Sequence, residues 1–176
     1  LTKIRDLPEP SIAAALNNAD TEQVLLDVLR ENPRKVLEGL SIAAYGINAA
    51  RKILSLPAGQ EALADELKEL ADEYQTEVKA EFLDVRANKE TVIIHIVTAA
   101  VLSDAFAGND TDYAYISVNG EKLKKVPAET KIEELSDVTK AKALLLGYRL
   151  YGPEAASLTV REAQIDNGVI RVLTDN

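Results

Sequence analysis

Hydrophobic residues in the first 107 positions recur at spacings of three and four, which is the period of an α-helix. The longest such stretch runs from Gln60 to Ala87, and its outward positions are mostly acidic. Residues 34–56 are apolar on more than one side, and shorter stripes occupy residues 11–16 and 21–31. Residues 1–10 contain two prolines and predict an extended lead-in. Together these patterns predict an N-terminal helical bundle.

Residues 91–107 fit two patterns at once. The β-branched residues of their first half favour a strand, whereas the alanines and leucine of the second half suit a helix. We expect a helix, because the segment is longer than a usual strand and no turn divides it. The polar residues 108–112 then predict a linker, so the expected domains are residues 1–107 and 113–176.

The last third of the chain alternates short apolar runs with turn residues. Two runs, Tyr113–Val118 and residues 121–126, flank Asn119-Gly120, the dipeptide most typical of a tight hairpin turn. A one-sided apolar stripe of Ile132, Leu135 and Val138 predicts a short helix that begins at Lys131. The segments that follow are residues 143–146 and 148–151 as strands, 158–163 as one helical turn, and 169–173 as a closing strand. The predicted order is β-β-α-β, a short helical turn, then β.

This order of elements resembles the ubiquitin-like β-grasp family. Leu158–Ile165, followed by a turn at Asp166–Gly168 and by Val169–Leu173, is similar to the family's closing pattern of short helix, buried isoleucine, glycine turn and last strand. Leu144–Leu150 is similar to its third strand, which contains a glycine bend. The resemblance covers Tyr113–Leu173. It implies an α+β fold class in which an N-terminal helical bundle precedes a small ubiquitin-like β-grasp-type module.

Many β-grasp relatives are docking modules that use the exposed face of the sheet. The resemblance places Leu144, Arg171 and Leu173 on that face, with Lys142 at its edge. An apolar patch with a basic rim would bind a protein partner through a few buried anchors. The alternative, which the sequence leaves open, is that Leu144 and Leu173 belong to the hydrophobic core.

Two glycines stand out in the apolar segment 34–56. Gly39 and Gly46 are seven positions apart, so on a helix they lie on nearly the same face. Small residues allow helix backbones to approach closely. The pair therefore predicts either a packing face for a partner helix or a tight crossing within the same domain.

Charge and composition exclude several classes of function. The net charge of −9 argues against general binding to nucleic acid or to anionic membranes. Residues 1–110 hold 11 Lys and Arg against 19 Asp and Glu, a net charge of −8, so the acidic excess belongs to the first part. That surface either attracts a basic partner or is simply solvated. We expect a soluble protein that is cytoplasmic by default.

Most catalytic and metal-binding chemistry lacks its residues in this chain. The sequence has no cysteine, which excludes disulfides, thiolate nucleophiles and cysteine-based metal sites. His95 is the single histidine and lies in an apolar run, which predicts a core histidine with one satisfied nitrogen. No dinucleotide fingerprint, P-loop or calcium loop is present. We therefore predict no catalytic residue, no metal site and no cofactor, and we lean against an enzyme.

These observations favour a non-enzymatic interaction or scaffold protein that docks through the sheet face of its C-terminal module. The partner would be another protein or a second copy of the chain, which would make a homo-oligomer. One alternative is a structural subunit of a larger assembly, such as a virion or multi-subunit complex, with the apolar helix 34–56 as obligate interface. Another is a carboxylate-based hydrolase or an enzyme's regulatory subunit.

Overall fold

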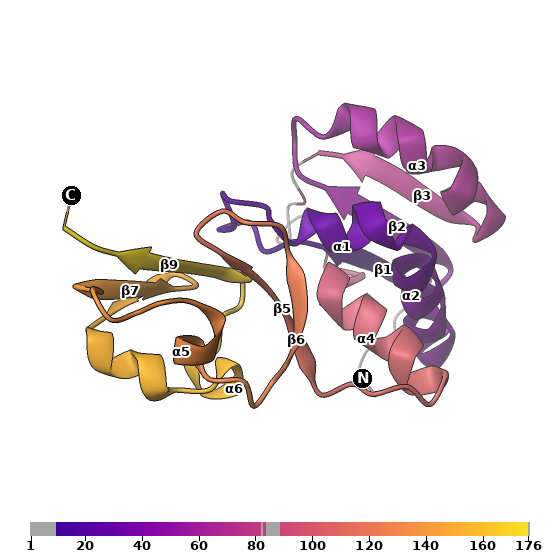
Figure 1. The fold of residues 1–176 in the computed structure, drawn as a ribbon. Helices are drawn as coiled ribbons and strands as arrows, with labels where there is room; N and C mark the ends of the chain where they lie inside the picture. The colour runs from indigo at the N-terminus through magenta and orange to yellow at the C-terminus, as the bar shows by residue number, and fades with distance from the viewer. Residues whose placement is uncertain (1–9, 82, 84–88, 176) are drawn as a thin grey trace. The chain divides into compact units, whose positions relative to one another are not determined.

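The chain divides into two units, one built on a parallel sheet and one on a mixed sheet (Figure 1). The computed structural model describes residues 10–81, 83 and 89–175, so the predicted lead-in lies outside the described residues except for Pro10. The first unit holds the described residues up to Thr21 together with Val28–Asn109. The second holds Asp110–Asn176 and also Glu22–Asp27, a segment that lies early in the sequence.

The first unit contains a four-stranded sheet in the order β3-β2-β1-β4. Its strands are β1 (Ser11–Ala15), β2 (Arg51–Leu56), β3 (Thr76–Ala80) and β4 (Thr91–His95). Each neighbouring pair is parallel, and β1 pairs with β2 on one side and with β4 on the other. All five residues of β1 are buried, because the strand lies inside the sheet and is covered on both faces.

The helices α2 (Pro33–Ile47), α3 (Glu61–Glu73) and α4 (Ile96–Phe106) contact these strands. A short helix, α1 (Leu26–Glu31), precedes α2, and its first two residues belong to the second unit. The start of α2 follows from local sequence, since the Asn32 side chain accepts a hydrogen bond from the Lys35 amide and Pro33 occupies the first helical position. α3 lies beside β3, and α2 packs against α4 (Figure 1). The first unit is therefore an α/β structure.

α2 and α4 cross at Gly39. A β-carbon added there would lie 1.6 Å from the carbonyl oxygen of Ala99, so the two helix backbones are in direct contact. A β-carbon added at Gly46 would meet nothing within 4 Å. The sequence left two interpretations of this glycine pair. At Gly39, the structure shows a tight helix crossing within one unit.

The predicted N-terminal helical bundle is wrong, and with it the fold class of a helical bundle followed by a small β-grasp-type module. Residues 11–15 and 51–56, predicted as helix, form β1 and β2. The helix predicted over 34–56 ends early, because Asn48 takes a left-handed conformation with φ of 54°. A strand that is buried on both faces has no polar alternation, so its alanines and leucines match a buried helix equally well.

Two further helix predictions need correction. The helix predicted over residues 60–87 ends at Glu73; Gln75 has φ of 52° and β3 follows, while residues 82 and 84–87 lie outside the described part of the chain. The segment 91–107 begins as β4 and becomes α4 only at Ile96. Both patterns combined the apolar positions of a strand and a helix into one apparent helical period.

The second unit contains a five-stranded mixed sheet in the order β6-β5-β9-β7-β8. Its strands are β5 (Tyr113–Val118), β6 (Lys124–Pro127), β7 (Ala143–Leu146), β8 (Arg149–Tyr151) and β9 (Val169–Leu173). β5 and β9 are parallel, and the other neighbours are antiparallel. Three short helical segments complete the unit: α5 (Ile132–Leu135), a 3-10 helix at Pro153–Ser157 and α6 (Val160–Ala163).

The hairpin predicted at Asn119-Gly120 is confirmed. β5 and β6 pair antiparallel, and both turn residues have positive φ, 50° and 81°. The Glu121 amide donates to the Val118 carbonyl at 2.9 Å and closes the turn. Asparagine and glycine tolerate this conformation, so the local sequence alone specifies the turn.

Candidate functional site

The carboxyl ends of β1 and β4 lie side by side at one edge of the parallel sheet. The chain leaves β1 toward β2 and β3 on one side, and returns to form β4 on the other side of β1. This reversal of direction makes the boundary between β1 and β4 the switch point of the sheet. Open α/β sheets bind ligands outside the carboxyl ends of strands at such a point. The topology therefore predicts a ligand site there.

A pocket of about 190 Å³ lies at this edge, and we name it the switch-point pocket. Its walls come from the end of β1 and the following loop, from β4, and from the segment after β3. The lining residues are Ala15, Leu16, Asn17, Asn18, Leu83 and Ile93. Four of these side chains are apolar, two carry amides, and none is charged. The described lining of the pocket suits a small uncharged group.

The loop after β1 is shaped by the first of its two asparagines. The Asn17 side-chain oxygen accepts a hydrogen bond from the Ala19 amide at 3.0 Å, and its backbone carbonyl accepts one from the Asp20 amide at 2.9 Å. Asn18 is exposed at the rim, where its amide nitrogen donates to the Leu83 carbonyl at 3.5 Å. Asn17 therefore holds the loop, while Asn18 offers a polar group to a ligand.

His95 ends β4 and caps α4. Its Nδ1 accepts a hydrogen bond from the Val97 amide at 3.1 Å, so this nitrogen carries no proton in that arrangement. The side chain is half-buried, where a core histidine was expected. Its geometry supports the start of α4.

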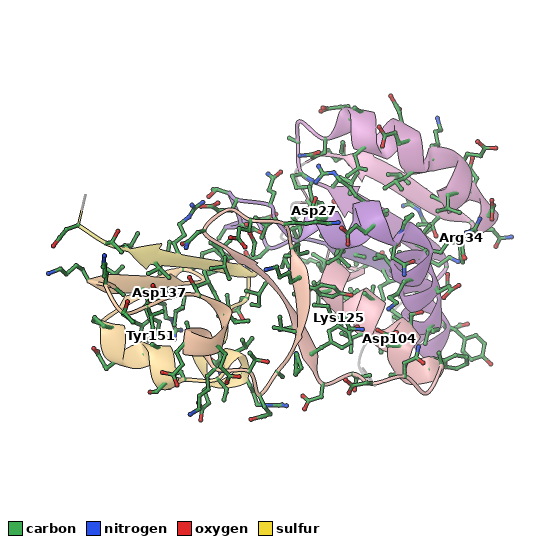
Figure 2. All side chains as sticks on the ribbon, viewed as in Figure 1. Asp27, Arg34, Asp104, Lys125, Asp137 and Tyr151 are labelled. Atoms are coloured by element: carbon green, nitrogen blue, oxygen red, sulfur yellow. The ribbon has the colours of Figure 1, made fainter. Side chains whose placement is uncertain are left out.

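A buried ion pair joins α2 to α4. The Lys35 Nζ lies 2.9 Å from Oδ1 and 3.0 Å from Oδ2 of Asp104, whose side chain is only 3% exposed. The Asn109 side chain also donates to Oδ1, at 3.2 Å. Figure 2 labels Asp104 on α4 and Arg34 on α2. The pair therefore joins the two helices, and removal of the ammonium alone would leave a buried charge without its partner.

A groove of about 310 Å³ lies between α2 and α4, away from the switch-point pocket. We name it the α2–α4 groove. Its lining residues are Glu38, Ser41, Ile42, Tyr74, Ser103, Phe106 and Ala107. The Glu38 carboxylate accepts hydrogen bonds from the Ser103 hydroxyl at 3.0 Å and from the Tyr74 hydroxyl at 3.5 Å. The groove thus combines an apolar surface with one carboxylate.

Two cations near this groove are held by other groups. Hydrogen bonds from Arg34 to Tyr74 and Glu73, and the charge of Glu73, raise the pKa of the Arg34 guanidinium. The Lys52 Nζ donates to the Ser41 hydroxyl at 3.0 Å, and burial lowers the pKa of this ammonium. Neither cation is bonded to the Glu38 carboxylate.

The predicted role of Leu144 as an exposed docking anchor is wrong. Its side chain is fully buried and belongs to the core of the second unit. Successive residues of a strand point to opposite faces, so Leu145, which pairs with Arg171, lies on the outer face. The sequence alone left Leu144 open between the core and the docking surface, and the register of β7 decides for the core.

The other three predicted binding residues lie nearer the surface. Arg171 is half-buried and donates to Glu22 at 2.6 Å, Lys142 is exposed and lies 3.2 Å from Asp175, and the Leu173 side chain is 41% exposed. Their role in binding stays a prediction.

We expect Leu144→Asp to unfold the second unit, with a loss of more than about 4 kcal/mol, because it places a charge in a core. The matched variant is Leu150→Asp on β8, where the side chain is 67% exposed and the change should cost less than about 0.5 kcal/mol. Urea denaturation followed by circular dichroism measures both. Equal stabilities for the two variants would contradict the observed register.

Comparisons with known proteins find a shared fold but no matching family. No protein-family model matches the chain, and a search of curated proteins also finds no match. Two crystal structures of an NAD+-reducing NiFe hydrogenase share the fold. The H2-reduced state has a TM-score of 0.72 at 16% identity, and the air-oxidised state has 0.76 at 14%. Each match covers 97% of this chain but only 42% and 41% of the hydrogenase chains, so this chain spans about two-fifths of their length.

This comparison overturns the predicted function. The non-enzymatic scaffold docking through its C-terminal module is corrected, because two solved chains that share this fold, at 16% and 14% identity, belong to an NAD+-reducing hydrogenase, and the expected anchor Leu144 is buried. The alternative with helix 34–56 as obligate interface needs correction in its element, since α2 ends at Ile47 and residues 51–56 are β2. The carboxylate-based hydrolase finds no support in the switch-point pocket, whose described lining has no carboxylate.

The described residues do not fit a whole NAD molecule at the switch-point pocket. A pyrophosphate needs glycine in the loop after the first strand, so that backbone amides can approach it closely. Here Asn17–Asp20 follows β1, and the first glycine of the chain is Gly39. Asp20 adds a buried carboxylate to this loop. The loop therefore opposes a bound pyrophosphate.

No group of three or more potential metal ligands occurs among the described residues. In the same part of the chain, no helix has the length and apolar character to cross a membrane.

Proposed function

We propose that this chain is part of a redox enzyme, in which the first unit binds a small uncharged group in the switch-point pocket. The observation that carries the proposal is the position of the pocket, at the carboxyl ends of β1 and β4 where the sheet changes direction. The shared fold with chains of an NAD+-reducing hydrogenase supports the redox context.

The lining defines the class of ligand. Ala15, Leu16 and Ile93 offer an apolar surface, and Asn18 offers an amide at the rim. An uncharged heteroaromatic ring with one carboxamide matches this combination, because its faces are apolar and its amide hydrogen-bonds. A charged or phosphorylated ligand would leave its charges without partners in the described lining.

Nicotinamide is the probe that tests this proposal. In a titration of the full chain followed by NMR, we expect it to shift the backbone signals of Asn17, Asn18 and Ile93. NAD+ should bind no more tightly than nicotinamide, because the loop after β1 provides no site for the pyrophosphate. Ile93→Phe should weaken nicotinamide binding by about tenfold or more, since the larger ring fills the pocket.

The matched control is Ile94→Phe, which makes the same change at the next residue of β4, on the opposite face of the strand. It should leave nicotinamide affinity within about twofold of the parent chain. Shifts confined to other regions, or equal weakening by both variants, would refute the assignment of the pocket.

The resemblance of Tyr113–Leu173 to the ubiquitin-like β-grasp family stays a prediction, as do the domain limits at residues 107 and 113. The division of the chain between Asn109 and Asp110 supports those limits.

A further inference from the structure

The α2–α4 groove carries an inference beyond the proposed ligand site. Phe106, which lines it, is 80% exposed, and Tyr45, one turn beyond Ile42 on α2, is 90% exposed. Large aromatic side chains are rarely left so exposed on a monomer, and they are enriched at protein interfaces. These two residues are the most exposed large hydrophobic side chains of the described structure. They mark this face as one that another molecule covers.

The charge within the groove indicates what that molecule carries. Glu38 receives hydrogen bonds only from the hydroxyls of Tyr74 and Ser103, so its negative charge is not neutralised by a cation among the described residues. The two cations beside it on α2 are committed elsewhere. Arg34 pairs with Glu73 at 3.1 Å, and Lys35 pairs with the buried Asp104. The Glu38 carboxylate can therefore accept further hydrogen bonds from a positively charged donor.

The hydroxyls also fix the position of the carboxylate. Ser103 donates to Oε2 and Tyr74 donates toward Oε1, so both oxygens are held at the wall of the groove. A planar guanidinium can bond a fixed carboxylate with two parallel N–H groups and can also stack on an aromatic ring. Tyr74 and Phe106 supply rings in the same groove. The Lys52 ammonium at the same groove donates to the Ser41 hydroxyl and not to the Glu38 carboxylate.

We infer that the α2–α4 groove binds a segment of a protein partner that presents an arginine flanked by apolar residues. The arginine pairs with Glu38 and stacks on the aromatic rings, while its apolar neighbours cover Ile42 and Phe106. The negative charge of residues 1–110 would favour the approach of such a basic segment.

The test uses the full chain and the tripeptide acetyl-Leu-Arg-Leu-amide. The control peptide replaces arginine by citrulline, which has nearly the same shape but no charge. In an NMR titration, we expect the arginine peptide to shift the signals of Ser41, Ile42, Ser103 and Ala107. The citrulline peptide should bind about fivefold to tenfold more weakly, because it lacks the charge that Glu38 attracts.

Two variants with the same change of charge separate the groove from general electrostatics. Glu38→Gln should weaken the arginine peptide about fivefold to tenfold, whereas Glu66→Gln on the exposed face of α3 should change its affinity by less than twofold. Phe106→Ala should weaken both peptides. Equal binding of both peptides, an equal effect of both glutamine variants, or shifts outside the groove would overturn the inference. A dimer in light scattering that Phe106→Ala dissociates would also overturn it, because the occupant would then be a second copy.

Discussion

Gly39→Ala is expected to destabilise the first unit by more than about 3 kcal/mol. The new β-carbon would lie 1.6 Å from the Ala99 carbonyl oxygen, whereas real β-carbons essentially never approach another atom closer than 3.0 Å. Relief requires α2 and α4 to move apart along their whole contact, since the obstacle is backbone and cannot change rotamer. Urea denaturation followed by circular dichroism measures the loss.

Gly46→Ala is the matched control, because it makes the same change seven residues later in α2. A β-carbon there meets nothing within 4 Å, so helix propensity decides, and the variant should gain up to about 1 kcal/mol. Gly39→Ala is thus expected to lower the free energy of unfolding, and Gly46→Ala is expected to raise it. A stabilising Gly39→Ala would show that α2 and α4 do not cross at this point.

The second large effect is expected from Lys35→Met, at about 3–5 kcal/mol of lost stability. The substitution leaves the Asp104 carboxylate, 3% exposed, without the ammonium that lies 2.9 Å away. The control is Arg34→Met, which removes the neighbouring cation from a pair whose side chains are more than half exposed. Because an exposed pair contributes little to stability, the loss should be much smaller than for Lys35→Met. Chemical denaturation of both variants gives the comparison.

The double variant Lys35→Met with Asp104→Leu distinguishes a buried charge from lost packing. If the cost of Lys35→Met comes from the unpaired carboxylate, replacing Asp104 by leucine should restore most of the stability. If the double variant is as unstable as the sum of the two single variants, Lys35 and Asp104 contribute independently and our explanation is wrong.

The sequence contains a signal for the switch-point pocket, but the signal can be recognised only when residues 11–15 are assigned as a strand. Asn17 and Asn18 looked like a break after a short helix, because residues 11–15 contain three consecutive alanines. With the same residues assigned as a buried strand, the two asparagines that follow it after Leu16 mark the carboxyl end of the sheet, where α/β proteins bind ligands. The Lys35–Asp104 pair had a similar signal, since Asp104 is the one charged residue of α4.

The sequence by itself determined the features that depend on a few neighbouring residues. Asn119-Gly120 specifies its turn, Asn32-Pro33 starts α2, and composition excludes cysteine chemistry. Only the tertiary structure decided that residues 11–15 and 51–56 are strands and that Leu144 is core. The physical reason is that an apolar run can be buried as helix or strand, and pairing with distant segments selects between them. The pocket joins Asn18, Leu83 and Ile93, which local preferences cannot bring together.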